Sequence, residues 1–267
     1  MKRRVMFLLS MCCLLAACGG TDPSDAAFPA VDLFEQPIPD APDPADRAGA
    51  AAEYIECTNE ISNGGWSHDF GTSGNASNPD GALDQFLGVD LFVLPDDGYV
   101  PVGRDTDRLL YTYSVDNTPK VAVIVAANST DPNGGWTVET FATCDPAEYD
   151  PSIDDQLSVD IWLDSDGNRV PTSTLTSYRG AEHCGWESVT FLTVDDRQYI
   201  GDPRGMLTDT VWFDGDAALP ADATDTGFHH DGRHLWISDD QAVAYIVGSD
   251  SVEAWPAPPS GDPVACA

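Results

Sequence analysis

A short polar stretch near the carboxyl end holds most of the side chains that could do acid–base or metal chemistry. His229, His230 and His234, three of the five histidines, lie close to Asp225 and Asp231. Imidazole and carboxylate groups serve as general bases and as zinc ligands. Neighbouring residues of a strand point to opposite faces, so at most two of the histidines share a face, too few for zinc. We expect a solvated hairpin without a bound metal, and four residues stay weak ligand-site candidates: His229, His230, Asp231 and Asp225.

The rest of the chain contains no motif of a known reaction. The G-x-S-x-G turn, the H-E-x-x-H helix and the Gly-rich phosphate loops are all absent from the sequence. With 45 acidic side chains, carboxylate pairs would arise by chance, so a pair does not indicate a glycosidase. No cofactor is indicated. The lack of motifs favours a binding or scaffolding module with a ligand groove where the two halves of the chain meet, and the alternative is a hydrolase that uses residues between Asp225 and His234.

Asp164, Asp166 and Asn168 begin like an EF-hand calcium loop, in which alternate side chains bind the ion. The position of the loop's turn glycine holds Arg169, and the twelfth position holds Leu175 in place of a glutamate. A strand–turn–strand hairpin on the Asp-Gly pair explains the pattern better. Calcium is therefore only weakly indicated as a partner.

The amino terminus predicts a lipid anchor. Residues 1–17 have a basic start, a short apolar run and small residues before Cys18, which resembles the signal and lipobox of bacterial lipoproteins. The Cys18 thiol would take a diacylglycerol and become the new amino terminus. We therefore predict a lipoprotein on the extracytoplasmic face of the cell membrane, and an ordinary signal peptide with a chance cysteine is the alternative. The apolar run is shorter than the about 20 residues that span a bilayer.

The chain is strongly acidic, with 45 Asp and Glu residues, 12 Lys and Arg residues and a net charge of −33. Removal of residues 1–17 takes away three basic residues and no acidic ones, so the mature charge changes from −33 to −36. Such a charge repels nucleic acid and anionic headgroups, which excludes binding through a basic patch. We interpret the acidity as a solvated surface, and an envelope protein or a glycan stays open as a partner.

Four cysteines remain besides the lipidated Cys18 after signal removal: Cys57, Cys144, Cys184 and Cys266. An even number in an exported protein predicts disulfides, and four cysteines allow three pairings. The internal repeat described next selects Cys57–Cys144 and Cys184–Cys266, since each bond then joins the beginning of one copy to its end. None of the four belongs to a C-x-x-C pair, which argues against redox catalysis.

Short blocks recur in the same order in the two halves of the chain and predict an internal duplication. Val121–Val125 and Val243–Val247 would be the central strands of the two copies. Neither run alternates apolar with polar residues, so each should be buried on both faces of its sheet. The other matching blocks are Gly65-Trp66 with Gly185-Trp186, Asn78–Leu83 with Asp202–Leu207, Leu94-Pro95 with Leu219-Pro220, Gly98–Arg104 with Gly227–Arg233, and Val138–Phe141 with Val252–Trp255.

Strand patterns outnumber helical patterns in both copies. The predicted fold is α+β and strand-dominated, with two tandem copies of a small helix-plus-antiparallel-meander unit over residues 46–150 and 151–267. Two separate domains and one pseudo-twofold body both fit this length. The meander strands are predicted at Arg108–Val115, Lys120–Ala127 and Trp136–Cys144 in copy one, and at Arg233–Ser238, Val243–Gly248 and Ser251–Trp255 in copy two.

A tether over residues 18–45 is predicted to join the anchor to the body. It is rich in proline, and Pro-rich chain extends by about 3.1 Å per residue, so it could hold the body up to roughly 80 Å from the membrane. Its apolar residues, among them Val31 and Leu33, would dock on the body or on a partner. A helix over Ala48–Glu60, capped by Asp46, is predicted to open the body.

A run of motifs in the second half of the chain is similar to a group of exported proteins. The motifs are Trp162–Thr172, Glu182–Trp186, Thr190–Leu192, Tyr199–Leu207, Leu219–Gly227, Leu235-Trp236 and Glu253–Pro256. They resemble uncharacterised secreted proteins and lipoproteins of actinobacteria. The resemblance covers about residues 159–267 and reaches copy one only through the internal repeat. That family has no assigned activity, so the resemblance implies export and no mechanism.

The lipid anchor makes a direct prediction. Cys18→Ala, or treatment with globomycin, should move the protein from the membrane fraction to the medium or to an uncleaved precursor, because the thiol that takes the lipid is lost or the signal stays attached. Cell fractionation measures the outcome. A cleaved Cys18→Ala protein that stays in the membrane fraction would contradict the lipoprotein prediction.

Overall fold

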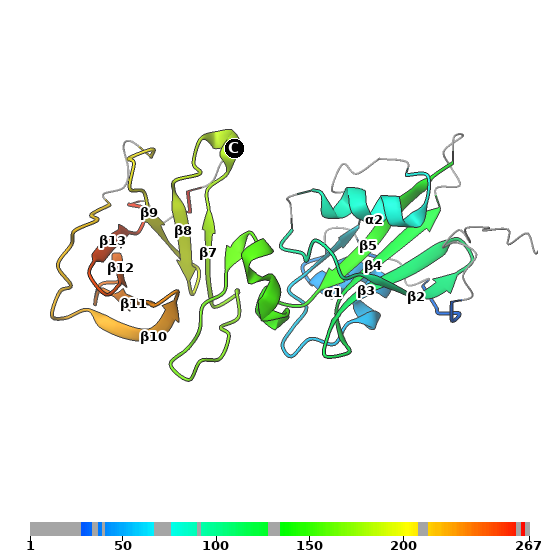
Figure 1. Cartoon of the computed structure of the whole chain (residues 1–267), viewed down its shortest axis with the longest axis horizontal. Helices are drawn as coiled ribbons and strands as arrows, with labels where there is room; N and C mark the ends of the chain where they lie inside the picture. The colour runs from blue at the N-terminus through cyan, green and yellow to red at the C-terminus, as the bar shows by residue number, and fades with distance from the viewer. Residues whose placement is uncertain are drawn as a thin grey trace, which may run out of the picture.

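The computed structural model describes residues 28–33, 37–38, 41–66, 76–89, 92–127, 134–207, 213–259 and 263–264 of the 267. These residues form two lobes that lie side by side, with β1–β5 in one and β7–β13 in the other (Figure 1). The described strands form three antiparallel sheets, and the described helices are few and short. The predicted strand-dominated α+β class is therefore confirmed.

The first lobe is built on a five-stranded antiparallel sheet with the strand order β1-β5-β4-β3-β2. Asp116 and Asn117, between β3 and β4, both have positive φ angles of 51° and 65°, as the tight turns that join two antiparallel strands require. The predicted meander of copy one agrees with β3, β4 and β5 to within two residues at each end. The strands are β1 (Asn63–Trp66), β2 (Val100–Asp105), β3 (Arg108–Val115), β4 (Thr118–Ala127) and β5 (Trp136–Thr143).

Helices cover both faces of this sheet. The α-helix α2 (Pro79–Leu87) packs on the face to which Val123 points, and the 3₁₀ helix η2 (Gly49–Tyr54) packs on the face of Ile124. Val123 and Ile124 are 0% and 1% exposed. The prediction that Val121–Val125 is buried on both faces is therefore confirmed, and an unalternating apolar run is what such a strand needs.

The helix that opens the body begins and ends earlier than predicted. The first α-helix, α1, spans Pro44–Ala48, and its N-cap is Asp43, whose carboxylate accepts a hydrogen bond of 2.9 Å from the Ala45 amide. At Gly49 the chain takes a φ of 53°, which ends the α-helix, and η2 then continues only to residue 54. The predicted helix over Ala48–Glu60 with a cap at Asp46 is therefore wrong. Among the described helices, none is long and apolar enough to cross a membrane.

Residues 28–33 form a short strap along the edge strand β2. Ala30 forms a parallel bridge with Arg104, and the Val31 amide donates to the Arg104 carbonyl at 3.2 Å. Val31 lies so close to Gly103 that a Cβ atom there would come within 2.6 Å of the valine side chain. The strap lies inside the predicted tether, so this part of the tether docks on the body, which is one of the two alternatives that the sequence left open.

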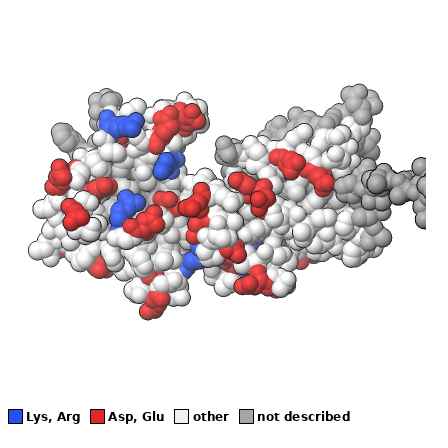
Figure 2. Space-filling model, in the orientation of Figure 1, with Lys and Arg blue, Asp and Glu red and all other residues white. Residues whose placement is uncertain are grey.

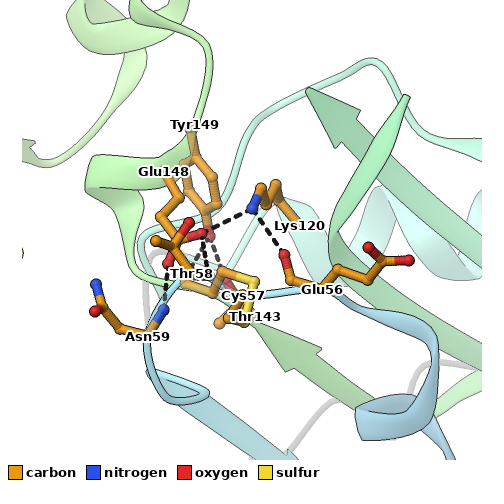
Figure 3. Close-up of a disulfide and its surroundings, with 9 residues drawn as sticks. Glu56, Cys57, Thr58, Asn59, Lys120, Thr143, Glu148 and Tyr149 are labelled. Atoms are coloured by element: carbon orange, nitrogen blue, oxygen red, sulfur yellow. Dashed lines mark hydrogen bonds and ion pairs between the residues drawn. A yellow bond between two sulfur atoms is a disulfide. The ribbon is translucent and has the colours of Figure 1, made fainter. Parts of the chain in front are cut away.

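A disulfide between Cys57 and Cys144 fastens the segment after η2 to the end of β5 (Figure 3). The two residues are 87 positions apart. Closing so long a loop stabilises the fold by roughly 4 kcal/mol if the gain is counted as chain entropy. The predicted Cys57–Cys144 pair is confirmed. Cys184 is disulfide-bonded too, and Cys266, its predicted partner, lies outside the described residues.

The second lobe consists of two four-stranded antiparallel sheets with the orders β6-β7-β8-β9 and β10-β11-β12-β13. Apolar side chains of both sheets meet between them, for example Leu175 and Leu192 from one sheet and Leu235 and Ile246 from the other. The strands are β6 (Val159–Asp160), β7 (Leu175–Arg179), β8 (Thr190–Val194), β9 (Arg197–Gly201), β10 (Thr224–His230), β11 (Arg233–Ile237), β12 (Val243–Val247) and β13 (Val252–Pro256).

These two sheets also meet along their edges, so the lobe approaches a closed barrel. At one edge Leu163, just after β6, exchanges two backbone hydrogen bonds of 2.8 Å with His229 of β10. At the other edge β9 and β13 are in contact, and the Trp255 ring packs so tightly on Gly201 that a Cβ atom there would lie 2.5 Å from it. Strands thus follow one another around most of the lobe.

Two of the predicted correspondences between the copies differ in the structure. Gly103 lies within β2, whereas Gly232 lies in the turn between β10 and β11. On β12, Ala244 and Ile246 are buried but Tyr245 is only half-buried, so the predicted burial of Val243–Val247 on both faces is wrong. The physical reason is that no described helix covers the outer face of this sheet. The tandem duplication is not confirmed.

The unequal burial of β4 and β12 predicts unequal responses to a new charge. Val123→Asp would place a carboxylate at a site with 0% exposure, which costs several kcal/mol and should abolish the unfolding transition of the first lobe. Tyr245→Asp should leave the protein folded, with a melting temperature lower by a few degrees, because water reaches the half-buried site. Calorimetry measures both, with the exposed turn variant Asp239→Ser as control. Unfolding of Tyr245→Asp to the same extent as Val123→Asp would contradict this account.

Candidate functional site

One end of the second lobe opens into a polar cavity between the two sheets. Its volume is about 270 Å³. Each of the eight strands β6–β13 contributes at least one residue to its lining, together with Trp162 and the loops nearby. We call this cavity the barrel mouth. Its lining includes Asp160, Ser177, Arg179, Thr190, Gly201, His230, Asp231, Arg233, Ile246, Glu253 and Trp255.

A chain of hydrogen bonds forms the floor of the barrel mouth. The Trp162 indole Nε1–H donates to the Ser177 hydroxyl at 3.0 Å, and that hydroxyl donates to the Asp160 carboxylate at 2.6 Å. Ser177 is only 1% exposed. Its proton is therefore committed to Asp160, and the hydroxyl is not poised as a nucleophile.

His230 lies at one wall of the barrel mouth, and protein groups orient its ring. Nδ1 is 3.0 Å from the carbonyl oxygen of Ile161, and a carbonyl oxygen only accepts, so Nδ1 carries the hydrogen in this contact. Nε2 then faces two carboxylates, Asp160 at 3.7 Å and Asp231 at 3.6 Å. The ring also packs beside the Trp162 indole, with the centroids 5.7 Å apart.

The four residues that the sequence offered as site candidates separate into two pairs. His230 and Asp231 both line the barrel mouth. His229 points to the other face of β10, where its ring stacks on that of His234 with the centroids 5.6 Å apart. The Asp225 carboxylate accepts a hydrogen bond of 2.9 Å from the Gly227 amide and shapes the turn there. The structure therefore brings together two of the four.

Sequence reasoning missed most of the barrel mouth. Asp160, Ser177, Arg179, Arg233 and Glu253 come from β6, β7, β11 and β13, which meet only when the sheets close. The sequence offered one signal for this site: Arg179 and Arg233 each lie at one end of a strand pattern, in a chain with few basic residues.

The two arginines of the barrel mouth have no partner among the residues that the structure describes. Neither the Arg179 nor the Arg233 guanidinium forms an ion pair or a side-chain hydrogen bond with any residue that the structure describes. Figure 2 shows that Lys and Arg side chains on this face gather on the second lobe, among Asp and Glu side chains. The barrel mouth thus combines unpaired cationic groups with nearby carboxylates.

The stretch that begins like a calcium loop is a hairpin. Leu163 and Arg169 form an antiparallel bridge around it, as the favoured interpretation of the sequence predicted. Asp164 caps the turn, since its carboxylate accepts from the Asn168 side chain and from the Asn168 and Asp166 amides, and these bonds lower the pKa of Asp164. Within the described part of the chain, no grouping of His, Cys, Asp and Glu side chains could hold a metal ion.

A second hollow of about 540 Å³ lies near the junction of the lobes, lined by residues 59–62, Asp145, Pro171 and their neighbours. Several polar groups in it and beside it are paired with one another. Asp145 accepts bonds of 2.9 Å from the amide and the hydroxyl of Thr172, and Arg169 holds Asp154 with two bonds of 2.7 Å. These contacts join the first lobe to the second, so we assign this region to structure.

The same junction contains a nearly buried ion pair beside the Cys57–Cys144 disulfide (Figure 3). The Lys120 ammonium donates to Glu148 at 2.8 Å and to the Glu56 carbonyl at 2.7 Å. Burial alone would raise the pKa of Glu148, but the hydrogen bonds from Lys120 and from the Thr58 amide outweigh it and lower the pKa. Lys120 is the only lysine beyond residue 17.

Compared with protein-family models, curated proteins and solved structures, the chain matches none. The resemblance to actinobacterial secreted proteins therefore stays a prediction.

The lowered pKa of Glu148 predicts a pH-dependent stability. The ionised carboxylate stabilises the fold above its unfolded pKa of about 4.3, and this contribution is lost as the pH falls through the lower pKa of the folded state. Glu148→Gln should therefore unfold more easily than the wild type at neutral pH, by about 3 kcal/mol, because it leaves the Lys120 charge nearly buried without its partner. The difference should shrink as the pH falls through the lowered pKa of Glu148, where the wild-type carboxyl becomes protonated as well.

Denaturant unfolding at a series of pH values measures this difference. Glu182→Gln, on the exposed surface, is the matched control and should follow the wild type at every pH. A Glu148→Gln deficit that does not change with pH would contradict the assigned role of the ion pair.

Proposed function

We propose that the protein is a lipid-anchored extracytoplasmic binding protein that holds a small polar ligand in the barrel mouth. One observation carries the proposal. Two guanidinium groups without partners in the described part of the chain and three carboxylates converge there from facing sheets, while Lys120 and Arg169 at the lobe junction are paired with carboxylates. Barrel mouths are common ligand sites because the strands hold the lining side chains rigidly in place.

The size and polarity of the barrel mouth limit which ligands it can hold. The volume of about 270 Å³ lies just below the range for ligand pockets, which begins at about 300 Å³. Ser177, Thr190 and Asp160 offer hydroxyl and carboxylate groups, and Trp162 and Trp255 are buried and serve as walls rather than as exposed stacking platforms. A small molecule with several hydrogen-bonding groups fits this lining.

Hydrolysis is the second candidate, and the placement of His230 favours it specifically. Nε2 faces the cavity between two carboxylates, where it could take a proton from a water molecule. Against this, Asp160 stands between Ser177 and His230, so the three do not follow the serine–histidine–aspartate order of an acyl-transfer triad. Binding is therefore the better-supported function.

The anchor and the internal duplication belong to the same proposal. Cys18 lies outside the described residues, and its lipidation is supported by the lipobox pattern alone. Support for duplication is that both lobes contain a four-stranded meander whose third strand, β4 or β12, holds the matching apolar run. The blocks at Asn78 and Asp202 also behave alike, since each side chain accepts hydrogen bonds from amides three to five residues later.

A ligand panel with matched variants tests the proposed function. Calorimetric titration of residues 28–267 with common amino acids, monosaccharides, sugar acids and small hydroxy acids should give saturable binding for at least one class. His230→Ala should weaken that binding about tenfold, through the loss of one polar wall, whereas His234→Ala on the opposite face should not change it. Near-UV circular dichroism confirms that both variants stay folded.

The two function classes give different results in the same titration. Mass spectrometry of the recovered ligand should find it unchanged if the protein only binds it, and release of a hydrolysis product that requires His230 would favour the alternative. Equal effects of His230→Ala and His234→Ala, or no binding by any class, would contradict a site at the barrel mouth.

A further inference from the structure

The unpaired arginines of the barrel mouth are unexpected in so acidic a chain. Acidic residues outnumber basic ones by 45 to 12. Two other arginines form two-pronged pairs with a carboxylate: Arg108 holds Glu139 at 2.5 and 2.9 Å, and Arg169 holds Asp154 with two bonds of 2.7 Å. Arg179 and Arg233 share one cavity with three carboxylates and form no such pair with any described residue.

Two of the three nearby carboxylates are instead occupied by other donors. Asp160 accepts from Ser177 at 2.6 Å, and its second oxygen lies near His230. Glu253 accepts from the Trp255 indole Nε1–H at 2.9 Å. The third carboxylate, Asp231, is exposed and lies only near His230. The donors of the two guanidinium groups are thus left unused, and what they lack is an acceptor with negative charge.

The two guanidinium groups enter from facing sheets at the outer level of the cavity. Along β7, exposure rises from Leu175 through Ser177 to Arg179, which is exposed at the strand end. Along β11, buried Leu235 is followed outward by half-buried Arg233. Both side chains line the same cavity. An entering molecule would therefore meet one guanidinium on each side before it reached the floor at Ser177.

We propose that Arg179 and Arg233 form an anion clamp and that the ligand is a small organic acid whose carboxylate lies between them. This inference rests on the proposed function and names its ligand class. A planar guanidinium binds a carboxylate with two parallel hydrogen bonds, which a neutral ligand cannot reproduce. The hydroxyl or amine groups of the same molecule would donate to Asp160 or Glu253 deeper in the cavity.

A ligand with a single negative charge is the anion most compatible with the acidic protein. The chain as a whole carries −33, so a multiply charged anion would be repelled before it reached the cavity. An arginine side chain binds a phosphate group through the same paired hydrogen bonds as a carboxylate. Titration with both anions distinguishes a carboxylate ligand from a phosphorylated one.

The clamp is testable by nuclear magnetic resonance of the arginine Nε–H groups in residues 28–267. Acetate is the probe for the carboxylate, and inorganic phosphate is the second arm. We expect the Arg179 and Arg233 signals, assigned through Arg179→Gln and Arg233→Gln, to shift saturably with one common Kd for acetate. Arg204, which is exposed and does not line the cavity, should shift only linearly and serves as the internal control.

Each substitution should raise the acetate Kd at the remaining arginine about tenfold, the effect expected for one lost charged hydrogen-bonding group. Arg204→Gln should leave the acetate Kd unchanged. Saturation by phosphate with only linear shifts in acetate would overturn the organic acid in favour of a phosphorylated ligand. Linear shifts of both arginines with both probes would overturn the clamp.

The outcomes also separate this inference from the proposed function. If a neutral sugar binds in the ligand panel and depends on His230, while both arginines respond to anions only as Arg204 does, the clamp is refuted and the binding site stands. If neither the panel nor the anions give saturable binding, both proposals fail.

Discussion

The two backbone hydrogen bonds between Leu163 and His229 are the constraint on which the second lobe depends. They join the edge of one four-stranded sheet to the edge of the other, and so they turn two separate layers into a nearly continuous wall. Because side chains alternate along a strand, the pairing of His229 also fixes its neighbour His230 toward the interior, where Ile161 holds the ring. A shift of one residue at this bridge would exchange the two histidines and dismantle the cavity.

The two lobes divide the physical tasks. In the first, helices cover both faces of the sheet, and the disulfide and the Lys120–Glu148 pair fasten its end. Among the described residues of this lobe, every buried polar side-chain atom has a hydrogen-bond partner except the Tyr99 hydroxyl and one carboxylate oxygen of Asp105. The second lobe leaves its interior open and polar at one end. Polar groups in an interior lower the stability of the fold, and proteins keep them where ligand binding requires them.

Local patterns predicted local structure well. The β3–β4 hairpin follows from a run of apolar and aromatic residues on each side of Asp116 and Asn117. The long-range Cys57–Cys144 bond was selected among three possible pairings by the blocks that recur in the two halves of the chain. The helix near residue 48 was misplaced because Pro44 and Asp43 compete with Asp46 for its start. The barrel mouth could not be predicted, since Asp160 and Glu253 become neighbours of one cavity only through the closure of two sheets, which no local pattern encodes.

The strap changes how far the protein can reach. With residues 28–33 fixed along β2, only the nine residues from 19 to 27 separate the body from Cys18, and a fully extended chain of that length spans about 30 Å. The strap lies at the end of the first lobe that points away from β6–β13 (Figure 1). A lipid on Cys18 would therefore keep the first lobe close to the bilayer, where the acidic body is repelled by anionic headgroups, and would present the second lobe outward. The ligand would then bind at the end of the protein that lies farther from the membrane surface.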